Sequence, residues 1–308
     1  MAFAGFYEQL GSNTTDLFAT TAYLLRGTPM FNKSLLAVTL VLAITVTASA
    51  SITRTRVENF TVDPGAHIDV KINGGSINVK IGASGQVRVE VIEVAKTNSE
   101  TEADEMISKS PPIIEKTAQG GVRVALQPEN LKINWFGWHG DRGVQYNVNL
   151  TVPAKADLNL DTSGGNIKVD GEVEGELRAN TSGGSIRVTG GAGKISLDTS
   201  GGGITVDRVL QQLHADTSGG SIHVGYVSPT ATDVNVDTSG GGINIGLDPA
   251  GNYDLDADTS GGSVNVSGLT FDAHRKDRTH AQGKINKGGA PVHADTSGGS
   301  IDVHAAQP

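Results

Sequence analysis

Cysteine is absent from all 308 residues of this chain. Its absence excludes disulfide bonds, thiol nucleophiles and thiolate metal ligands, and also the acylated cysteine that follows the signal sequence of a lipoprotein. The fold must therefore be held together by backbone hydrogen bonds and by side-chain packing.

Aromatic residues and positive charges are also scarce. Phe, Trp and Tyr make up 5% of the chain, whereas Gly occurs 41 times. The apolar residues are mostly Val, Ile, Leu and Ala, which favours short β-strands joined by turns over packed helices. The 24 Lys and Arg against 33 Asp and Glu give a net charge of −9. We expect no nucleic-acid partner, because phosphate binding requires clustered Lys and Arg.

Common catalytic motifs are missing too. The chain contains no G-x-S-x-G, no H-E-x-x-H and no P-loop, which are the signatures of common hydrolases and nucleotide-binding enzymes. We therefore predict no catalytic residue, no cofactor and no metal.

The N-terminal region carries the pattern of an export signal. From Met30 the chain reads MFNKSLLAVTLVLAITVTASA, with an early lysine, an apolar run and a terminal A-x-A cleavage site. We expect residues 30–50 to be a signal peptide, with an uncleaved anchor as the alternative, and the mature chain to begin near Ser51. Residues 1–29 are expected to be a non-native upstream extension. The predicted location is periplasmic, cell-surface or extracellular.

A phrase of the form D-T-S-G-G-x-I-x-V recurs through the second half of the chain. Successive copies start 18–21 residues apart, except for a last interval of 37 residues. Within that interval, residues 284–295 resemble a worn copy and residues 274–280 are expected to form a loop. An earlier relative lies at residues 72–79. The copies start at Asp161, Asn180, Asp198, Asp216, Asp237, Asp258 and Asp295.

Each copy lies between two period-two alternations of apolar residues. Around Asp216 these are Leu213-x-Ala215 and Ile222-x-Val224, a spacing typical of strands with one buried face. One unit is too short to bury that face alone, so the copies must stack. We predict an all-β fold, namely a single-stranded β-solenoid built from these 18–21-residue repeats. Ile222 should then point inward and His223 outward.

The Ser-Gly-Gly of each copy is expected to turn the chain between two strands. For the copy that starts at Asp216, we expect Gly219 or Gly220 to have a positive φ, or to leave no room for a Cβ between stacked turns.

Two parts are expected in the mature chain. Residues 51–153 should form an N-terminal β part of the solenoid with one helical insertion at 98–108, and residues 154–308 the repeat solenoid. The insertion is acidic and is followed by Pro111-Pro112, which would end a helix.

These features together resemble a known bacterial family. The repeated D-T-S-G-G-x-I-x-V units, the leading stretch FTVDPGAHIDVKINGGSINV at 60–79 and the signal-like N-terminus are similar to the adhesin-like β-strand-repeat proteins of domain of unknown function 4097. The resemblance covers about residues 57–303. It implies the repeat fold and an adhesin-type role, and it implies no catalytic or binding residues.

The repeated aspartates leave two interpretations open. Each Asp can cap its own turn as an Asx-turn, or the stacked carboxylates can hold a column of Ca²⁺ ions. Asn180 occupies the same position without a charge, and the spacing differs from that of the known Ca²⁺-binding nonapeptide repeat. Both points favour the turn cap.

Trp135 and Trp138 are the candidate ligand contacts. They lie in NWFGWHGD at 134–141, and exposed aromatic faces stack on sugar rings. Packing over an open side of the core is the alternative. His214, His223 and His293 are expected to be outward surface residues without metal.

Two functions from different classes are compatible with these patterns. The first is an exported, non-enzymatic β-solenoid, an adhesin or envelope-associated binding protein whose partners are surface or envelope glycans or proteins. End-to-end self-association is a further expectation, because solenoid ends expose strand edges. The alternative is a polysaccharide-active β-helix enzyme, a lyase or hydrolase, which requires a groove of acids and bases. The outward residues change identity from copy to copy without concentrating such groups, which favours the first.

Overall fold

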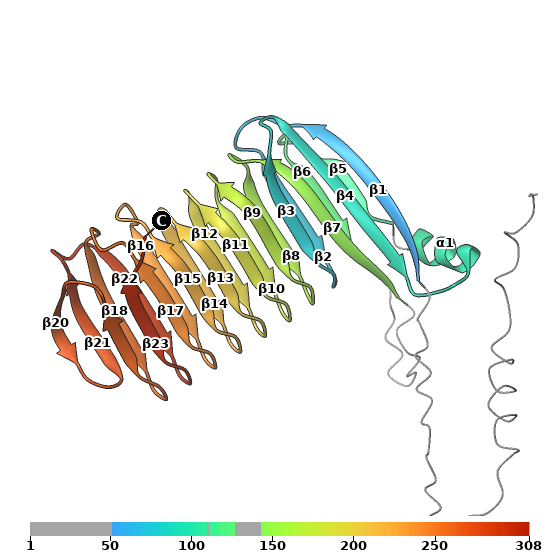
Figure 1. The fold of residues 1–308 in the computed structure, drawn as a ribbon. Helices are drawn as coiled ribbons and strands as arrows, with labels where there is room; N and C mark the ends of the chain where they lie inside the picture. Colours follow the sequence, from blue (N-terminus) through green and yellow to red (C-terminus); the bar gives the residue numbers. More distant parts are fainter. Residues whose placement is uncertain (1–50, 110, 127–142, 308) are drawn as a thin grey trace, which may run out of the picture. The chain divides into compact units, whose positions relative to one another are not determined.

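The computed structural model describes residues 51–109, 111–126 and 143–307, all within one compact unit, Ala48–Pro308. This part of the chain has 23 strands and one helix (Figure 1). The all-β prediction is confirmed. The expectations for residues 1–29 and 30–50, and for Trp135 and Trp138, concern residues outside the described ranges.

Two sheets contain all of these strands. The first sheet has 11 strands and the second sheet has 12. In spatial order, the first sheet consists of β1 (Ile52–Thr61), β4 (Gln86–Ala95), β7 (Val144–Pro153), β3 (Ile77–Gly82), β9 (Ile167–Val173), β11 (Ile186–Gly191), β13 (Ile204–Val209), β15 (Ile222–Val227), β17 (Ile243–Leu247), β23 (Ile301–Ala305) and β19 (Val264–Ser267). The second sheet consists of β20 (Phe271–Lys276), β21 (His280–Ile285), β18 (Tyr253–Thr259), β22 (Ala290–Thr296), β16 (Asp233–Thr238), β14 (Gln212–Thr217), β12 (Lys194–Thr199), β10 (Leu177–Thr181), β8 (Asp157–Thr162), β2 (His67–Ile72), β6 (Val122–Leu126) and β5 (Ile113–Lys116).

Each D-T-S-G-G copy forms the corner between a strand of the second sheet and a strand of the first. Neighbouring coils pair in parallel with like residues side by side, so that Thr217 lies beside Thr199 and Thr238. The apolar residues of both strands point between the sheets and form a continuous core. Ile222 is 1% exposed, whereas His223 is exposed, which confirms the inward and outward faces predicted for this coil.

The last coil does not follow the sequence order. β22 lies between β16 and β18, and β23 lies between β17 and β19. The long interval ahead of it contains no worn coil, because residues 271–285 form the antiparallel hairpin β20–β21, which pairs with β18. Since β21 occupies one edge of β18, only the other edge is left for β22. The interpretations of 284–295 as a copy and of 274–280 as a loop were therefore wrong.

The N-terminal part adds antiparallel strands to the stack. β2 and β3 pair in parallel with β8 and β9, as expected for the early relative of the repeat. β4 then pairs antiparallel with both β7 and β1. Helix α1 (Glu100–Ser108) follows β4, and Ser99 caps it by accepting a hydrogen bond from the Glu102 amide at 3.3 Å. The acidic first turn suits the positive end of the helix dipole.

Candidate functional site

The threonine of each D-T-S-G-G copy holds the corner. Thr217 is 1% exposed, and its hydroxyl donates to the Gly202 carbonyl of the neighbouring coil at 2.8 Å. The same hydroxyl accepts a hydrogen bond from the Gly220 amide of its own turn at 3.3 Å. This pair of bonds recurs at Thr181, Thr199, Thr238, Thr259 and Thr296.

The Asx-turn prediction for the aspartates is wrong. Among the described residues, no turn amide donates to the aspartate of its own copy. The cap is threonine, because a hydroxyl can donate to one coil and accept within another, whereas a carboxylate only accepts.

The second glycine of each turn is required for a steric reason. A Cβ on Gly220 would lie 2.1 Å from the Gly202 carbonyl oxygen, whereas a Cβ on Gly219 would lie 3.1 Å from the Gly201 carbonyl oxygen. Neither Gly219 nor Gly220 has a positive φ. The predicted left-handed backbone is therefore absent at this turn, and the predicted lack of room for a Cβ is confirmed at Gly220.

The aspartates form a column across the outer face of the second sheet. Asp216 lies beside Asp198 on one side and Asp237 on the other. Strand spacing puts neighbouring positions about 4.8 Å apart, so the carboxylates repel one another. The aspartate column consists, in spatial order, of Asp161, Asn180, Asp198, Asp216, Asp237, Asp295 and Asp258.

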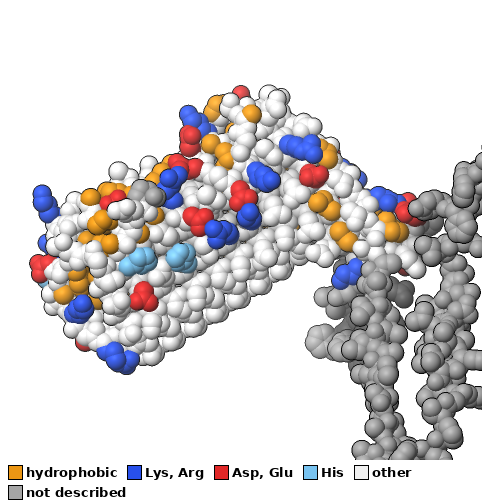
Figure 2. Space-filling model, viewed as in Figure 1, with side chains coloured by type: hydrophobic (Ala, Val, Ile, Leu, Met, Phe, Trp, Pro, Cys, Tyr) orange, Lys and Arg blue, Asp and Glu red, His pale blue; other side chains and the backbone are white. Residues whose placement is uncertain are grey.

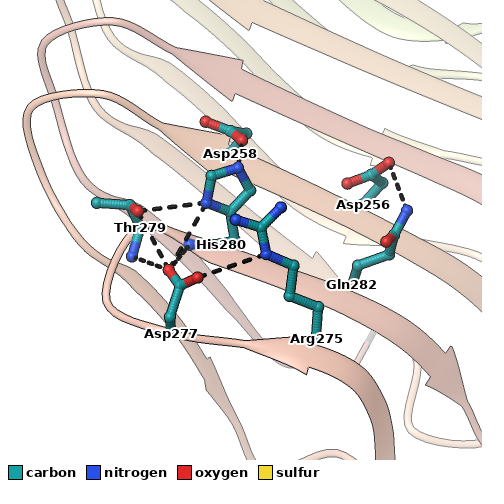
Figure 3. Close-up of polar contacts among 7 residues, drawn as sticks. All are labelled: Asp256, Asp258, Arg275, Asp277, Thr279, His280 and Gln282. Atoms are coloured by element: carbon teal, nitrogen blue, oxygen red, sulfur yellow. Dashed lines mark hydrogen bonds and ion pairs between the residues drawn. The ribbon is translucent and has the colours of Figure 1, made fainter.

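A basic side chain stands at each end of the aspartate column. Lys71 on β2 lies beside Asp161, with 3.8 Å between Nζ and Oδ2. At the other end His280 on β21 lies beside Asp258, and Nε2 of the imidazole contacts the Asp258 carboxylate (Figure 3). The column is thus bounded by residues that attract its terminal carboxylates.

The interior of the column is electrostatically strained. Partial burial raises the pKa of Asp237, and the neighbouring Asp216 and Asp295 carboxylates raise it further. Burial likewise raises the pKa of Asp198, with His214 opposing the rise. Within the described ranges, no three His, Asp or Glu side chains converge in a way that could hold a metal ion. The Ca²⁺ column interpretation therefore has no support in the geometry.

Figure 3 shows the cluster at the hairpin end of the column, where His280 lies between two carboxylates. Thr279 Oγ1 lies 3.2 Å from His280 Nδ1, a hydroxyl–imidazole pairing also found in nucleophilic sites. The Thr279 hydroxyl, however, also bonds to Asp277 at 3.1 Å. The hydrogen bond from the Thr279 amide is the main reason that the pKa of Asp277 is lowered. These contacts hold the β20–β21 turn together, and the contact between His280 and Asp258 joins it to β18.

A polar hollow of about 370 Å³ opens on the outer face of the first sheet. Asn149 accepts a hydrogen bond from Asn78 at 3.0 Å and donates to Glu90 at 3.3 Å. Figure 2 shows acidic and basic side chains interspersed on the face in view. The polar side chains that line the polar hollow come from β4, β7, β3 and β9 and are Arg88, Glu90, Asn149, Thr151, Asn78, Lys80, Lys168 and Asp170.

Comparison of the sequence with known protein families shows to which family the chain belongs. Residues 43–304 match the family described as Toastrack DUF4097. The chain belongs to the Toastrack DUF4097 family. The family resemblance proposed from the repeats is thereby confirmed. No curated protein matches this Toastrack chain.

Several solved structures are similar to this Toastrack chain at low identity. A candidate adhesin from Bacteroides fragilis is 8% identical with a TM-score of 0.39, and the match covers 81% of this chain and 97% of that one. A candidate cell adhesion protein from Clostridium sporogenes is 14% identical with a TM-score of 0.30, covering 82% and 100%. A candidate lipid-binding protein from Parabacteroides distasonis is 14% identical with a TM-score of 0.26, covering 81% and 96%.

The predicted surface histidines of the Toastrack chain do not come together. His223 and His293 are exposed, and His214 is half-buried with Nδ1 3.3 Å from Asn235 Nδ2.

In the part of the chain that the structure describes, no helix combines the length and apolar character that a membrane crossing requires.

Sequence reasoning missed Glu93. It lies on the inner face of β4 and is 3% exposed, and its Oε1 has no hydrogen-bond partner among the residues that the structure describes. Burial raises the pKa of this carboxyl, and Arg56 opposes the rise. The side chain borders a second hollow, of about 400 Å³, between β1, β4 and α1. The available signal was the alternation VRVEVIEV, in which Glu93 takes the inward position after Val87, Val89 and Val91.

Proposed function

We propose that this Toastrack protein is an exported, non-enzymatic β-solenoid that serves as an adhesin or as a binding component of the cell envelope. The observation that carries the proposal is a division of roles within each repeat. The threonine, the second glycine and the inward Ile and Val build the stack, which leaves the variable outward residues for recognition. The signal-like pattern of residues 30–50 supports a periplasmic, cell-surface or extracellular location.

The polar hollow is the proposed ligand contact. Asn149, Asn78 and Glu90 form a chain of hydrogen bonds across three strands, so their groups are held in fixed positions. Amide, carboxylate and ammonium groups within one hollow supply both donors and acceptors, and a small number of fixed polar groups gives a site its specificity. Such a set suits the hydroxyls of an envelope or cell-surface glycan. Trp135 and Trp138 remain a second proposed contact on sequence grounds alone.

A glycan array probed with the full-length chain tests the proposal. We expect retention of a defined set of glycans, and we expect Asn149→Ala to reduce it about tenfold, equivalent to ~1.4 kcal/mol. Asn244→Ala is the matched control, because Asn244 is a half-buried outward asparagine of β17 in the same sheet. Equal binding by both variants would remove the polar hollow as the site.

The enzymatic alternative is tested on the same glycans. Incubation of each retained glycan with the protein, followed by measurement of released reducing ends or of unsaturated sugars, should show no turnover. Release that depends on Asn149 or on Glu90 would replace the binding proposal with a polysaccharide lyase or hydrolase.

A further inference from the structure

The two ends of the coil stack have different edge strands. At one end β18 and β19 form the outermost coil. The hairpin β20–β21 lies against that coil, and the Val264 amide of β19 donates to the Arg278 carbonyl at 2.9 Å. There β20 is the outermost strand of the second sheet and carries the exposed charged residues Asp272, Arg275 and Lys276, whereas β19, the outermost strand of the first sheet, is only four residues long. Charged edge strands of this kind resist pairing with another chain.

At the opposite end, the outermost strands have no further partner strand among the described residues. β1 is the outermost strand of the first sheet and β5 is the outermost strand of the second. Val57 on β1 is 39% exposed and Ile113 on β5 is 52% exposed, and these are the only exposed large hydrophobic residues in the described ranges. Both therefore belong to edge strands at the same end of the stack. One edge of β1, which is ten residues long, pairs with no other strand of the described ranges.

The charged residues of β1 are arranged so that two copies of the strand can pair antiparallel with opposite charges side by side. Arg56 and Glu58 flank Val57 and lie opposite Val91 and Val89 of β4, so both point to the inner face. Neither forms an ion pair in the part of the chain that the structure describes, whereas Arg54 pairs with Glu100 and Asp104 of α1. If a second β1 pairs antiparallel with Val57 opposite Val57, then Arg56 of each strand lies opposite Glu58 of the other.

Other registers lose this match. A shift that centres the pair on Arg56 or on Glu58 places like charges directly opposite each other, which is destabilising. A register in which Arg56 faces Val57 joins the inner face of one sheet to the outer face of the other, because side chains alternate between faces along a strand. The register centred on Val57 places each Arg56 opposite a Glu58 and also keeps the inner faces of the two sheets on the same side.

We propose that two copies of this chain pair through their β1 edges, antiparallel and about a two-fold axis at Val57, so that the two 11-stranded sheets become continuous. The partner is a second copy of the same chain, and the interface is isologous, as in most homodimers. The contact supplies the missing backbone hydrogen bonds of β1 and two symmetric Arg56–Glu58 pairs. It leaves the polar hollow outside the paired edge, so this proposal stands independently of the glycan proposal.

The absence of cysteine from the chain makes a crosslinking test direct. In full-length Val57→Cys, the two introduced thiols would lie opposite each other, with Cβ atoms about 4.5–5.5 Å apart, close to the separation that a disulfide bridges. We expect rapid formation of a covalent dimer under mild oxidation. Asn59→Cys is the matched control, because Asn59 is an exposed residue on the same face of β1 that would lie opposite Thr55 and far from its own copy.

Charge reversal tests the same register without cysteine. Glu58→Lys should weaken dimerisation about tenfold or more in sedimentation equilibrium, equivalent to at least ~1.4 kcal/mol. The double variant Arg56→Glu with Glu58→Arg should restore it, and circular dichroism checks that each variant is folded. A wild-type chain that stays monomeric at high micromolar concentration would overturn the proposal. So would equal crosslinking at positions 57 and 59, or failure of the charge-swapped variant to recover.

Discussion

At the scale of single residues, Gly219 and Gly220 look alike in the sequence but occupy different surroundings. A Cβ on Gly220 would be placed 2.1 Å from a backbone carbonyl oxygen of the next coil, where no side chain can move aside, whereas at Gly219 the nearest atom is 3.1 Å away. The close approach of the coils at Gly220 therefore leaves no room for a side chain there.

We expect Gly220→Ala to destabilise the fold by about 1–3 kcal/mol, as overpacking does in cores. Gly219→Ala serves as its control and should cost less than half of that amount, because its neighbour needs to move only slightly. Thermal unfolding followed by circular dichroism measures both. Similar losses for the two variants would contradict the steric role assigned to the second glycine.

Glu93 is a carboxyl whose burial has a consequence for pH. Because burial raises its pKa in the folded chain above the ordinary value, the folded state binds more protons than the unfolded state between these two values. The stabilising effect of this proton is complete at low pH and is lost as pH rises through the raised pKa. Above that range the carboxylate is buried, and one of its oxygens has no hydrogen-bond partner within the described part of the chain.

Glu93→Gln should therefore raise the melting temperature at pH 7.5. The gain in the free energy of unfolding should be about 1–3 kcal/mol, which is the usual cost of an unsatisfied buried polar group. This gain should shrink as pH is lowered toward 4. Glu105→Gln, at an exposed position of α1, should have little effect at either pH. A gain from Glu93→Gln that is unchanged at pH 4 would show that ionisation of Glu93 is not its source.

At the scale of elements, the strands and their buried faces could be predicted from the sequence, but the contacts between strands could not. The alternation around Ile222 and Val224 identified the buried face because every copy repeats it. The role of Thr217 was missed because its hydroxyl donates to Gly202 of the neighbouring coil, 15 residues away in the sequence. Only the stacking of the coils brings these two residues together. The polar hollow was missed because its four strands come from segments between Asn78 and Asp170, which no local pattern connects.

The aspartate column is an element-scale feature with a measurable cost. Asp237 has carboxylates on both sides, and its raised pKa means that the column is most stable when Asp237 is protonated and loses stability as pH rises through that pKa. Asp237→Asn introduces the uncharged side chain that Asn180 already places in the column. At pH 7 it should stabilise the fold by roughly 0.2–1 kcal/mol, and the gain should fall at pH 3 and in high salt.

Asp233→Asn is the matched control for Asp237→Asn. Asp233 is an exposed residue on the same strand, and it lies beside Gln212 instead of another carboxylate. Urea unfolding at the two pH values compares the variants. A larger gain from Asp233→Asn would mean that net charge, and not the column, is responsible.

At the scale of the whole molecule, the order of the coils was the part of the fold that the sequence could not decide. The copies that start at Asp258 and at Asp295 have the same motif and the same alternation, so either could pack against the coil that contains Asp237. The choice is made by the hairpin β20–β21, which occupies one edge of β18 and thereby directs the last coil into the interior of the stack. Its strands lack the D-T-S-G-G phrase, and the repeat pattern therefore carried no information about them.

The insertion of the last coil between two earlier coils is the central structural claim, and paired cysteines in this cysteine-free chain test it most directly. Asn235 on β16 lies beside His293 on β22, and His293 lies beside Asp256 on β18. Adjacent strands are about 4.8 Å apart, within reach of a disulfide, whereas strands two apart are not. Mass spectrometry of the oxidised, digested protein should show a crosslink in Asn235→Cys with His293→Cys and none in Asn235→Cys with Asp256→Cys. A crosslink in the second pair and none in the first would contradict the insertion and restore a solenoid wound in sequence order.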